Sequence, residues 1–288
     1  FLRHMSSEKF ASTNVLVEEN IVHSTFLDRD VIVDAYLPKD IGNPSEISLL
    51  LVNDGQDLRR MPFSDILDKL ILNNEISSLV CIGIHCGPDR KMEYGVAATP
   101  DYLGRGAKAG DYTNFIFKEL LPYIRTRYFL PNIREKSFAG FSLGGLSALD
   151  IVWNHPEEFT KCGVFSGSLW WRSASYKDDY EDDKHRIMHE QVKGGTYFPW
   201  LHFFFECGAG DESADRNKNG IIDVIDDTRD LIKELKKIGY PRDAIKYLEL
   251  PNGKHDVPTW ASAFPDFIKW GWGKKENTPK KKRLSQGI

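Results

Sequence analysis

A serine near the middle of the chain is framed by glycines at the spacing of a catalytic turn. Ser142 lies in Gly140-Phe141-Ser142-Leu143-Gly144-Gly145, which fits the pattern G-x-S-x-G. Residues 136–139 before it are predicted to form a strand, and residues 143–153 after it a helix. In so tight a turn, the positions two before and two after the serine lie too close to other backbone for a side chain. The pattern therefore predicts a nucleophilic hydroxyl lifted above the strand end; the alternative is a glycine-rich turn with a capping serine.

A serine hydroxyl attacks at neutral pH only when a base takes its proton, so a histidine partner is expected. In chains with this type of turn, the order along the sequence is serine, acid, histidine. Three later histidines are candidates for the base. His202 lies within an apolar strand and His185 in a highly charged stretch, whereas His255 follows a predicted strand in the loop Pro251-Asn252-Gly253-Lys254. Because a side chain in such a loop can reach over the strand end, His255 is the predicted general base.

Several segments of the chain share their residues with one known family. They are Val52-Asn53-Asp54-Gly55-Gln56-Asp57, Gly140-Phe141-Ser142-Leu143-Gly144-Gly145, Asn154-His155-Pro156, Phe165-Ser166-Gly167-Ser168-Leu169-Trp170-Trp171 and Gly253-Lys254-His255-Asp256. In these segments the chain resembles the putative esterase family of the α/β-hydrolase superfamily, which includes enterochelin esterases, feruloyl esterases, S-formylglutathione hydrolase and the mycolyltransferases. The resemblance extends over residues 15 to 272, and it is specific for fold and chemistry rather than for substrate.

The resemblance implies which acid assists the histidine. The family's acid commonly ends a glycine-containing turn after a late strand, here the predicted strand over residues 203–207. This places the acid at Asp211, with Glu212 and Asp215 as close alternatives. The carboxylate would orient His255 and stabilise its protonated form.

Two backbone N–H groups are needed to hold the oxyanion of the tetrahedral intermediate. The N–H of Leu143 is one, because it lies at a helix N-terminus, where backbone donors and the helix dipole favour negative charge. The resemblance places the second at the N–H of Gln56, in the loop after the third strand. It also implies that Trp171 borders the substrate cleft, so Trp171 is predicted to contact the acyl or aryl group.

The stretch from Asp215 to Asp226 fits the spacing of an EF-hand-type calcium loop. The predicted ligands are the side chains of Asp215, Asn217, Asn219 and Asp226 and the carbonyl of Ile221, around a glycine at the sixth position. Two features depart from the pattern, since the last ligand is Asp instead of Glu and no helix is predicted before the loop. The alternative is a surface loop of Asx turns. A bound calcium ion would be structural and would fix the loop that carries the acid.

The remaining pattern of the chain predicts a single α/β domain. Residues 14–37 alternate apolar and polar positions and predict an antiparallel N-terminal hairpin. Short apolar strands then alternate with helices, which is typical of a mostly parallel central sheet with helices on both faces, here an α/β-hydrolase fold. Residues 14–273 form this predicted esterase domain. Residues 1–13 are interpreted as a tag remnant with an N-terminal extension, and residues 274–288 as a basic polar tail.

Composition excludes some partners. The 288 residues carry a formal net charge of −4, which gives no indication of a nucleic-acid partner. Without a run of eighteen or more apolar residues, no membrane span is expected. The first residues also lack the pattern of a signal peptide, so the predicted location is cytoplasmic, or periplasmic or secreted if a signal peptide has been removed. The oligomeric state is left open.

These residues together predict a serine carboxylic ester hydrolase that works through an acyl-enzyme. Its substrate is expected to be a small-molecule or carbohydrate-linked ester, such as a carbohydrate-linked acyl or feruloyl ester or a siderophore lactone. No cofactor is required for this chemistry. An acyltransferase with the same catalytic residues, or a catalytically silent binding protein on the same scaffold, is the alternative.

Overall fold

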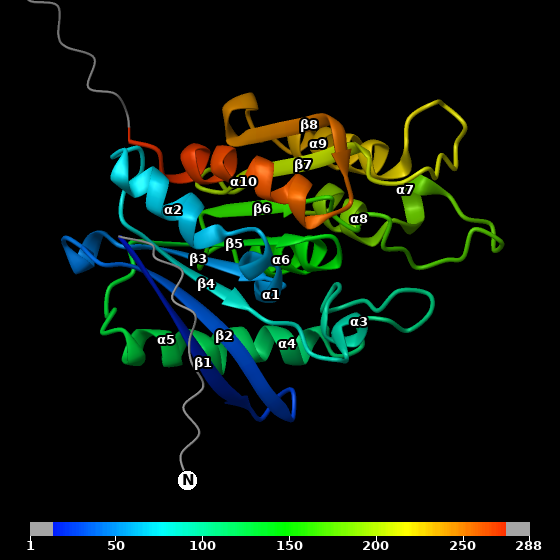
Figure 1. The fold of residues 1–288 in the computed structure, drawn as a ribbon. Helices are drawn as coiled ribbons and strands as arrows, with labels where there is room; N and C mark the ends of the chain where they lie inside the picture. The colour runs from blue at the N-terminus through cyan, green and yellow to red at the C-terminus, as the bar shows by residue number, and fades with distance from the viewer. Residues whose placement is uncertain (1–13, 275–288) are drawn as a thin grey trace, which may run out of the picture.

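A twisted sheet of eight strands forms the centre of the computed structural model, which describes residues 14–274 (Figure 1). The strands are β1 (Val15–Ser24), β2 (Arg29–Pro38), β3 (Ser48–Asn53), β4 (Leu79–Ile84), β5 (Glu135–Phe141), β6 (Lys161–Phe165), β7 (His202–Gly210) and β8 (Ile245–Lys254). Their order across the sheet is β1-β2-β4-β3-β5-β6-β7-β8. The pairs from β4–β3 onward are parallel, and only β1–β2 and β2–β4 are antiparallel. The predicted fold class and the N-terminal hairpin are confirmed.

Ten α-helices of the described residues follow or connect these strands. They are α1 (Gly55–Arg60), α2 (Phe63–Leu72), α3 (Arg90–Glu93), α4 (Ala109–Phe115), α5 (Leu121–Arg127), α6 (Leu143–Asn154), α7 (Asp182–His185), α8 (Ile187–Lys193), α9 (Asp223–Lys237) and α10 (Val257–Trp272). One π-helical turn, Ile116–Leu120, joins α4 to α5. The sequence pattern predicts a single helix here, but Pro122 has no N–H to donate to the preceding turn, and the helical bonding is irregular at this point.

Two apolar layers cover the two faces of the sheet. One contains side chains of α4, α5, α6, α8 and α9, and the other contains side chains of α1, α2 and α10. The inner parallel strands between them are largely buried on both faces; β3 and β4 have no exposed residue, whereas the edge strand β8 has several. This explains why these strands are continuous apolar runs in the sequence.

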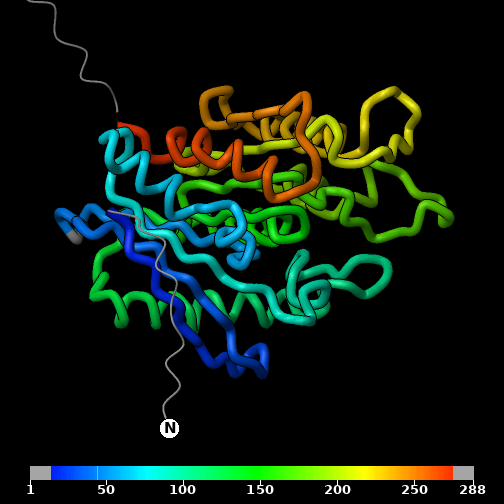
Figure 2. The backbone as a smooth tube through the Cα atoms, viewed as in Figure 1, coloured from blue at the N-terminus to red at the C-terminus, as the bar shows by residue number. Residues whose placement is uncertain are grey.

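The chain leaves the parallel strands at one common end of the sheet. The segments after β4, β6 and β7 all extend beyond this end, where they form the long loops on the right of Figure 2. The predicted nucleophile follows β5 at the same end. The segment after β6 had no predicted structure, and it contains the short helices α7 and α8.

Within residues 14–274, no helix is long and apolar enough to cross a membrane. The predicted tag remnant over residues 1–13 lies outside the described residues, as does the basic tail beyond Lys274. Lys274 itself still donates its backbone N–H to the carbonyl of Glu75 at 2.9 Å.

Candidate active site

Ser142 occupies a strained turn between β5 and α6. Its backbone angles are φ 54° and ψ −122°, a conformation that non-glycine residues rarely adopt. A Cβ atom at Gly140 would lie 2.3 Å from the carbonyl oxygen of Gly144, so residue 140 has no room for a side chain. The turn is held by a hydrogen bond from the Ser142 N–H to Phe165 O (2.8 Å) and one from Ser168 N–H to Ser142 O (3.1 Å).

The hydroxyl of Ser168 lies beside that of Ser142, the predicted nucleophile. Its Oγ lies 3.4 Å from Ser142 Oγ, and Ser168 is buried. Sequence reasoning did not identify Ser168, although it belongs to one of the segments that carry the family resemblance. This contact fixes where the Ser142 side chain points, because the backbone of Ser168 is also bonded to that of Ser142.

The two expected oxyanion donors lie at the first turns of α1 and α6. Gln56 is the second residue of α1 and Leu143 the first residue of α6, and N–H groups at these positions have no partner within their own helix. The helices begin side by side because β3 and β5 are neighbouring parallel strands. A hydrogen bond of 2.8 Å from Asn53 Nδ2 to Gly144 O joins the two strand ends.

The turn before Gln56 is fixed by a buried ion pair. Asp54 has a positive φ of 57° and accepts two hydrogen bonds from the Arg90 guanidinium, each 2.7 Å long. The Asp54 N–H donates to the hydroxyl of Tyr94 at 3.2 Å. Because Arg90 belongs to α3, this pair ties the oxyanion turn to the loop that follows β4. The sequence does not reveal the pairing of Arg90 with Asp54, since nothing along the chain connects the two residues.

His255 lies directly after β8, and Asp256 separates it from the first residue of α10. Its neighbour Asp256 caps α10 by accepting a hydrogen bond of 3.0 Å from the Thr259 N–H. One side of the His255 ring remains open to solvent, while the other packs edge-on against Trp260 with ring centres 5.4 Å apart. Burial of that inner side lowers the pKa of His255, the charge of Asp211 opposes this, and Arg90 lowers the pKa further. The imidazole is therefore neutral at pH 7, as a base requires.

Among the three candidate acids, Asp211 is the one whose charge acts on His255. Burial raises the pKa of Asp211, whereas the nearby Ser166 hydroxyl and His255 lower it. Asp215 instead accepts the backbone N–H groups of Asn219 (3.1 Å) and Gly220 (2.9 Å), and Glu212 accepts that of Val224 (2.7 Å). Asp215 and Glu212 are thus engaged within their own loop, and Asp211 is the candidate acid that acts on His255.

The described residues form no hydrogen bond that joins Ser142, His255 and Asp211. Both carboxyl oxygens of Asp211 are buried without a partner in the part of the chain that the structure describes. Catalytic hydrogen bonds are often long before substrate binds and tighten in the complex, so this geometry is compatible with a triad. The sheet positions the three residues at one end, after β5, β7 and β8.

The predicted role of Trp171 in substrate contact does not fit its position. Trp171 has no exposed surface, and its Nε1 donates to the carbonyl of Thr99 at 3.3 Å. A Cβ atom at Gly95 or Gly106 would lie 2.7 or 2.8 Å from the ring, so the indole fills the space under the loop after α3. We therefore correct Trp171 to a core residue. The adjacent Trp170 is partly exposed, with the Arg105 guanidinium 5.0 Å from its ring centre.

The loop from Asp215 to Asp226 brings its polar side chains together. The Nδ2 groups of Asn217 and Asn219 donate to Asp226 Oδ2 at 3.1 and 2.6 Å, and Asn219 Oδ1 accepts the Ile221 N–H at 2.8 Å. The Asn219–Ile221 contact is that of an Asx turn, whereas the other two contacts turn amide N–H groups toward Asp226. Asp226 lies in the first turn of α9, which begins three residues earlier at Asp223.

Arg216, between the first two predicted calcium ligands, points inward. Its guanidinium pairs with Asp182 (2.7 Å) and with the fully buried Asp227. The loop is therefore attached to α7 and α9 by ion pairs. In the described residues, no group of three or more His, Cys, Asp or Glu side chains is arranged to hold a metal. The loop would rely on two carboxylates, two amides and a carbonyl instead.

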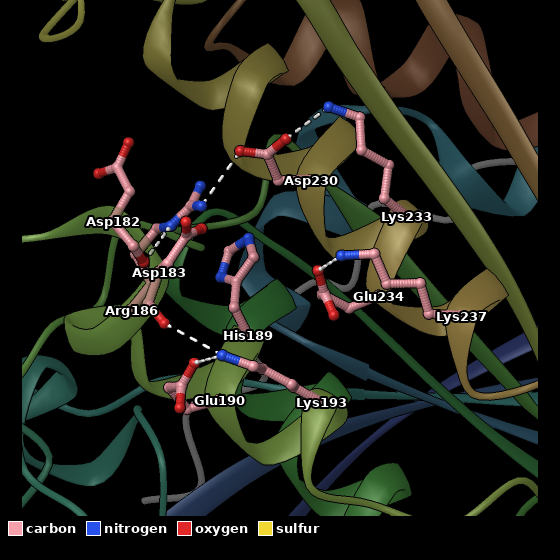
Figure 3. A pocket seen from close by; sticks show the side chains of 10 residues that line it. All are labelled: Asp182, Asp183, Arg186, His189, Glu190, Lys193, Asp230, Lys233, Glu234 and Lys237. Atoms are coloured by element: carbon pink, nitrogen blue, oxygen red, sulfur yellow. Dashed lines mark hydrogen bonds and ion pairs between the residues drawn. The ribbon is translucent and has the colours of Figure 1, made fainter.

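A charged pocket lies between α7, α8 and α9 (Figure 3). Its lining includes ion pairs within single helices, such as Lys193–Glu190 (3.2 Å) and Lys237–Glu234 (2.6 Å), and one pair between elements, Arg186–Asp230 (3.1 Å). None of the predicted catalytic residues lines this pocket. The pairs are those of a solvated helix surface, so the pocket carries no catalytic argument.

The sheet order and the strained turn define a protein of the α/β-hydrolase class. Solved structures with this fold include a ferulic acid esterase (18% identity, TM-score 0.66, 89% of this chain and 97% of that chain). A second is the enterobactin esterase FES from Shigella flexneri, with 20% identity and a TM-score of 0.68, which matches 88% of this chain and 58% of that chain. A third is an IroE-like serine hydrolase from Shewanella oneidensis, with 19% identity and a TM-score of 0.68, which matches 89% of this chain and 79% of that chain. The chain thus spans little more than half the length of the Shigella protein. At sequence identities of 18–20%, the similarity to these structures shows only that the fold is shared.

The family follows from the sequence itself. The model of the family described as "Putative esterase" matches residues 24–270, which is most of the chain. The chain therefore belongs to this esterase family, as the resemblance predicted. None of the curated protein sequences compared with the chain matches it.

Proposed function

We propose that the protein is a serine carboxylic ester hydrolase with Ser142 as nucleophile, His255 as general base and Asp211 as the supporting acid. The observation that carries the proposal is the backbone strain at Ser142, at the N-terminus of α6 and at the sheet end where His255 and Asp211 also lie. Strain of this kind costs about 1–3 kcal/mol and persists where function requires it.

In the proposed reaction, Ser142 Oγ attacks the ester carbonyl carbon while its proton moves to the His255 imidazole. The N–H groups of Leu143 and Gln56 stabilise the negative oxygen, each by about 3 kcal/mol. The intermediate collapses, the alcohol leaves with the proton from the imidazolium, and an acyl-enzyme remains. Water then gives a proton to His255 and attacks the acyl carbon to form a second intermediate. As this intermediate collapses, the bond from the acyl carbon to Ser142 Oγ breaks, Ser142 Oγ takes the proton back from the imidazolium, and the acid is released. Asp211 stabilises the imidazolium in both steps.

The proposed substrates are esters of small or carbohydrate-linked alcohols, including feruloyl esters and siderophore lactones. Support comes from the structural neighbours, which are named as a ferulic acid esterase, an enterobactin esterase and a siderophore hydrolase, EstB from Aspergillus nidulans. The last is 13% identical, with a TM-score of 0.65, and 93% of this chain matches 98% of that chain. An acyltransferase would share every step up to the acyl-enzyme and differ only in the acceptor.

The test is a panel of aryl esters, feruloyl sugars, acetylated xylan and catecholate trilactones, incubated with parent enzyme and with Ser142→Ala. The variant should lose about three or more orders of magnitude in kcat while it keeps the parent's melting midpoint. Retained turnover would overturn the nucleophile assignment. Added alcohol should leave the free acid as the main product, whereas a dominant new ester would favour acyl transfer.

We also propose that the loop from Asp215 to Asp226 binds a structural calcium ion, although catalysis requires no cofactor. The support is that the predicted ligands belong to one loop, in which the amides of Asn217 and Asn219 bond to Asp226. Asp215 accepts the backbone N–H groups of Asn219 and Gly220 in the same loop. Carboxylate, amide and carbonyl oxygens are the ligands that a hard cation takes. The ion would add to the ion pairs of Arg216 in holding the loop behind Asp211, and it would not touch the ester.

A further inference from the structure

Glu206 is a carboxyl group enclosed in the hydrophobic interior beside the candidate site. It lies on β7, five residues before Asp211, and it has no exposed surface. Neither of its carboxyl oxygens has a hydrogen-bond partner among residues 14–274. Its backbone is fixed between β6 and β8, and its carbonyl accepts the Ser166 N–H at 2.8 Å. A buried carboxylate without a donor is so unfavourable that such a group holds a proton instead.

The side chain of Glu206 faces the layer that contains α10. Residues two apart in a strand point to the same face, and Phe204 packs against Phe267 of α10 with ring centres 5.2 Å apart. On this face, Trp260 of α10 donates to the Ser166 hydroxyl at 2.9 Å and also packs against His255. Glu206 therefore lies under the part of the site where the histidine and its acid are positioned.

The charged group that acts on Glu206 is Asp211. Burial, and after it the charge of Asp211, raises the pKa of Glu206 to about 8. Beyond Asp211 lie His255 and Asp256 at the start of α10, and both act on Asp211 in turn. On β7 itself, Cys207 is the other titratable neighbour, and burial keeps it a neutral thiol by raising its pKa. Asp211 lies over the same face of β7, since its Oδ1 would be 2.7 Å from a Cβ atom at Gly208, two residues after Glu206. Glu206 and Asp211 are thus two carboxyl groups on one buried face that cannot both ionise at low energy.

We propose that Glu206 is a positioning residue for the catalytic acid, and that its protonated carboxyl donates a hydrogen bond to the carboxylate of Asp211. A protonated carboxyl is a donor, and neither buried oxygen of Asp211 has a hydrogen-bond partner within the described residues, although the Ser166 hydroxyl lies near enough to lower the pKa of Asp211. The bond would hold the Asp211 carboxylate toward His255 and leave the pair with a single negative charge. This inference rests on the proposed serine esterase function, since it assigns a role to a neighbour of that triad.

The proposal predicts an alkaline limit to activity. When Glu206 loses its proton, the bond to Asp211 is lost and two negative charges face each other in a buried place. The kcat/KM of the parent should therefore fall above about pH 8. If Glu206 had a purely structural role, its substitution would not change this alkaline fall.

The experiment measures kcat/KM from about pH 6 to 10 for the parent, Glu206→Gln and Glu206→Leu. At neutral pH the Leu variant, which has no donor, should lose about tenfold, the effect of one charge-assisted hydrogen bond. The Gln variant keeps an N–H donor, so it should recover most of that loss and show no alkaline fall. Glu135→Gln, at the opposite end of β5, is the control and should keep the parent's profile.

Infrared difference spectra supply a readout that does not depend on activity. At about pH 6.5 the parent should show a protonated carboxyl band that is missing in Glu206→Gln and that disappears from the parent by about pH 9.5. Parent-like profiles for both Glu206 variants, or no such band, would overturn the inference. A fully active Asp211→Asn would contradict Asp211 as the catalytic acid, and with it the proposed triad. If Asp211→Asn were inactive while both Glu206 variants behaved like the parent, only the role of Glu206 would be rejected.

Discussion

At the residue scale, the neutral imidazole of His255 determines how the reaction should depend on pH. Burial lowers the pKa of His255 from its ordinary value of about 6.5, and the nearby Arg90 lowers it further. A lowered pKa means that the base becomes competent at a lower pH than a free histidine. We expect kcat/KM to rise with pH in one step centred below about 6.5. If no such step appeared down to the lowest pH at which the enzyme stays folded, with chemistry rate-limiting, His255 would not be the base.

Arg90 offers a second test at this scale because it acts on both the base and the oxyanion turn. Arg90→Gln removes the charge that lowers the pKa of His255, so the acid limb of the profile should move to higher pH. The same change breaks the two hydrogen bonds to Asp54 and should lower kcat by about tenfold or more. Arg90→Lys keeps the charge and should leave the limb in place. Profiles that coincide for the parent and Arg90→Gln would show that Arg90 does not act on the base.

At the element scale, the strand-to-helix turn around Ser142 depends on close backbone contact between β5 and α6. Gly140→Ala would place a Cβ atom 2.3 Å from Gly144 O, and neither backbone can move without disturbing Ser142. We expect this variant to lose at least about 3 kcal/mol of stability, or to fold with almost no activity. Gly271→Ala is the control, because its Cβ atom meets only a flexible lysine at 3.5 Å. An active, stable Gly140→Ala would disprove the turn geometry.

The loop before α9 gives the second prediction at this scale. Saturating calcium should raise the melting midpoint, by about 2.7 kcal/mol of stability at a hundredfold excess over Kd if only the folded protein binds the ion. Activity should fall only partly with EDTA, since Arg216 already pairs with Asp182 and Asp227. The measurement is a melting curve in calcium and in EDTA for the parent and Asp215→Ala. Equal midpoints in both buffers for the parent would leave the loop as a set of Asx turns.

At the scale of the whole molecule, Glu206 connects the buried core with stability. Its pKa is about 8 in the folded protein against 4.5 for an ordinary glutamate, so the folded state holds more protons between these values. Stability should therefore fall as pH rises from about 4.5 to 8 and then level off. At pH 7 the loss is at most about 3 kcal/mol, at 1.36 kcal/mol per pH unit.

Glu206→Gln has no such proton to lose, so its stability should lack this fall. The measurement is denaturant unfolding of the parent and Glu206→Gln at several pH values from about 4.5 to 8. If the two proteins lost stability in parallel over this range, Glu206 would be ionised in the folded protein.

The fold was predictable because local patterns and sheet topology agree along most of the chain. Apolar runs mark the parallel strands, alternation marks the hairpin β1–β2, and the glycines around Ser142 mark the turn. Contacts between distant segments were not predictable in this way. The ion pair of Asp54 with Arg90 and the position of Glu206 beside Asp211 depend on packing that no local spacing encodes. The burial of Trp171 was missed because a motif gives the place of a residue but not the direction of its side chain.

The central claim is that Ser142 is the nucleophile and becomes acylated. The most direct test is intact-mass analysis and peptide mapping after treatment with a fluorophosphonate, on the parent, Ser142→Ala and Ser168→Ala. We predict one covalent adduct per chain on Ser142 in the parent and in Ser168→Ala, and none in Ser142→Ala. An adduct on another residue, or equal labelling of Ser142→Ala, would contradict the assignment of Ser142.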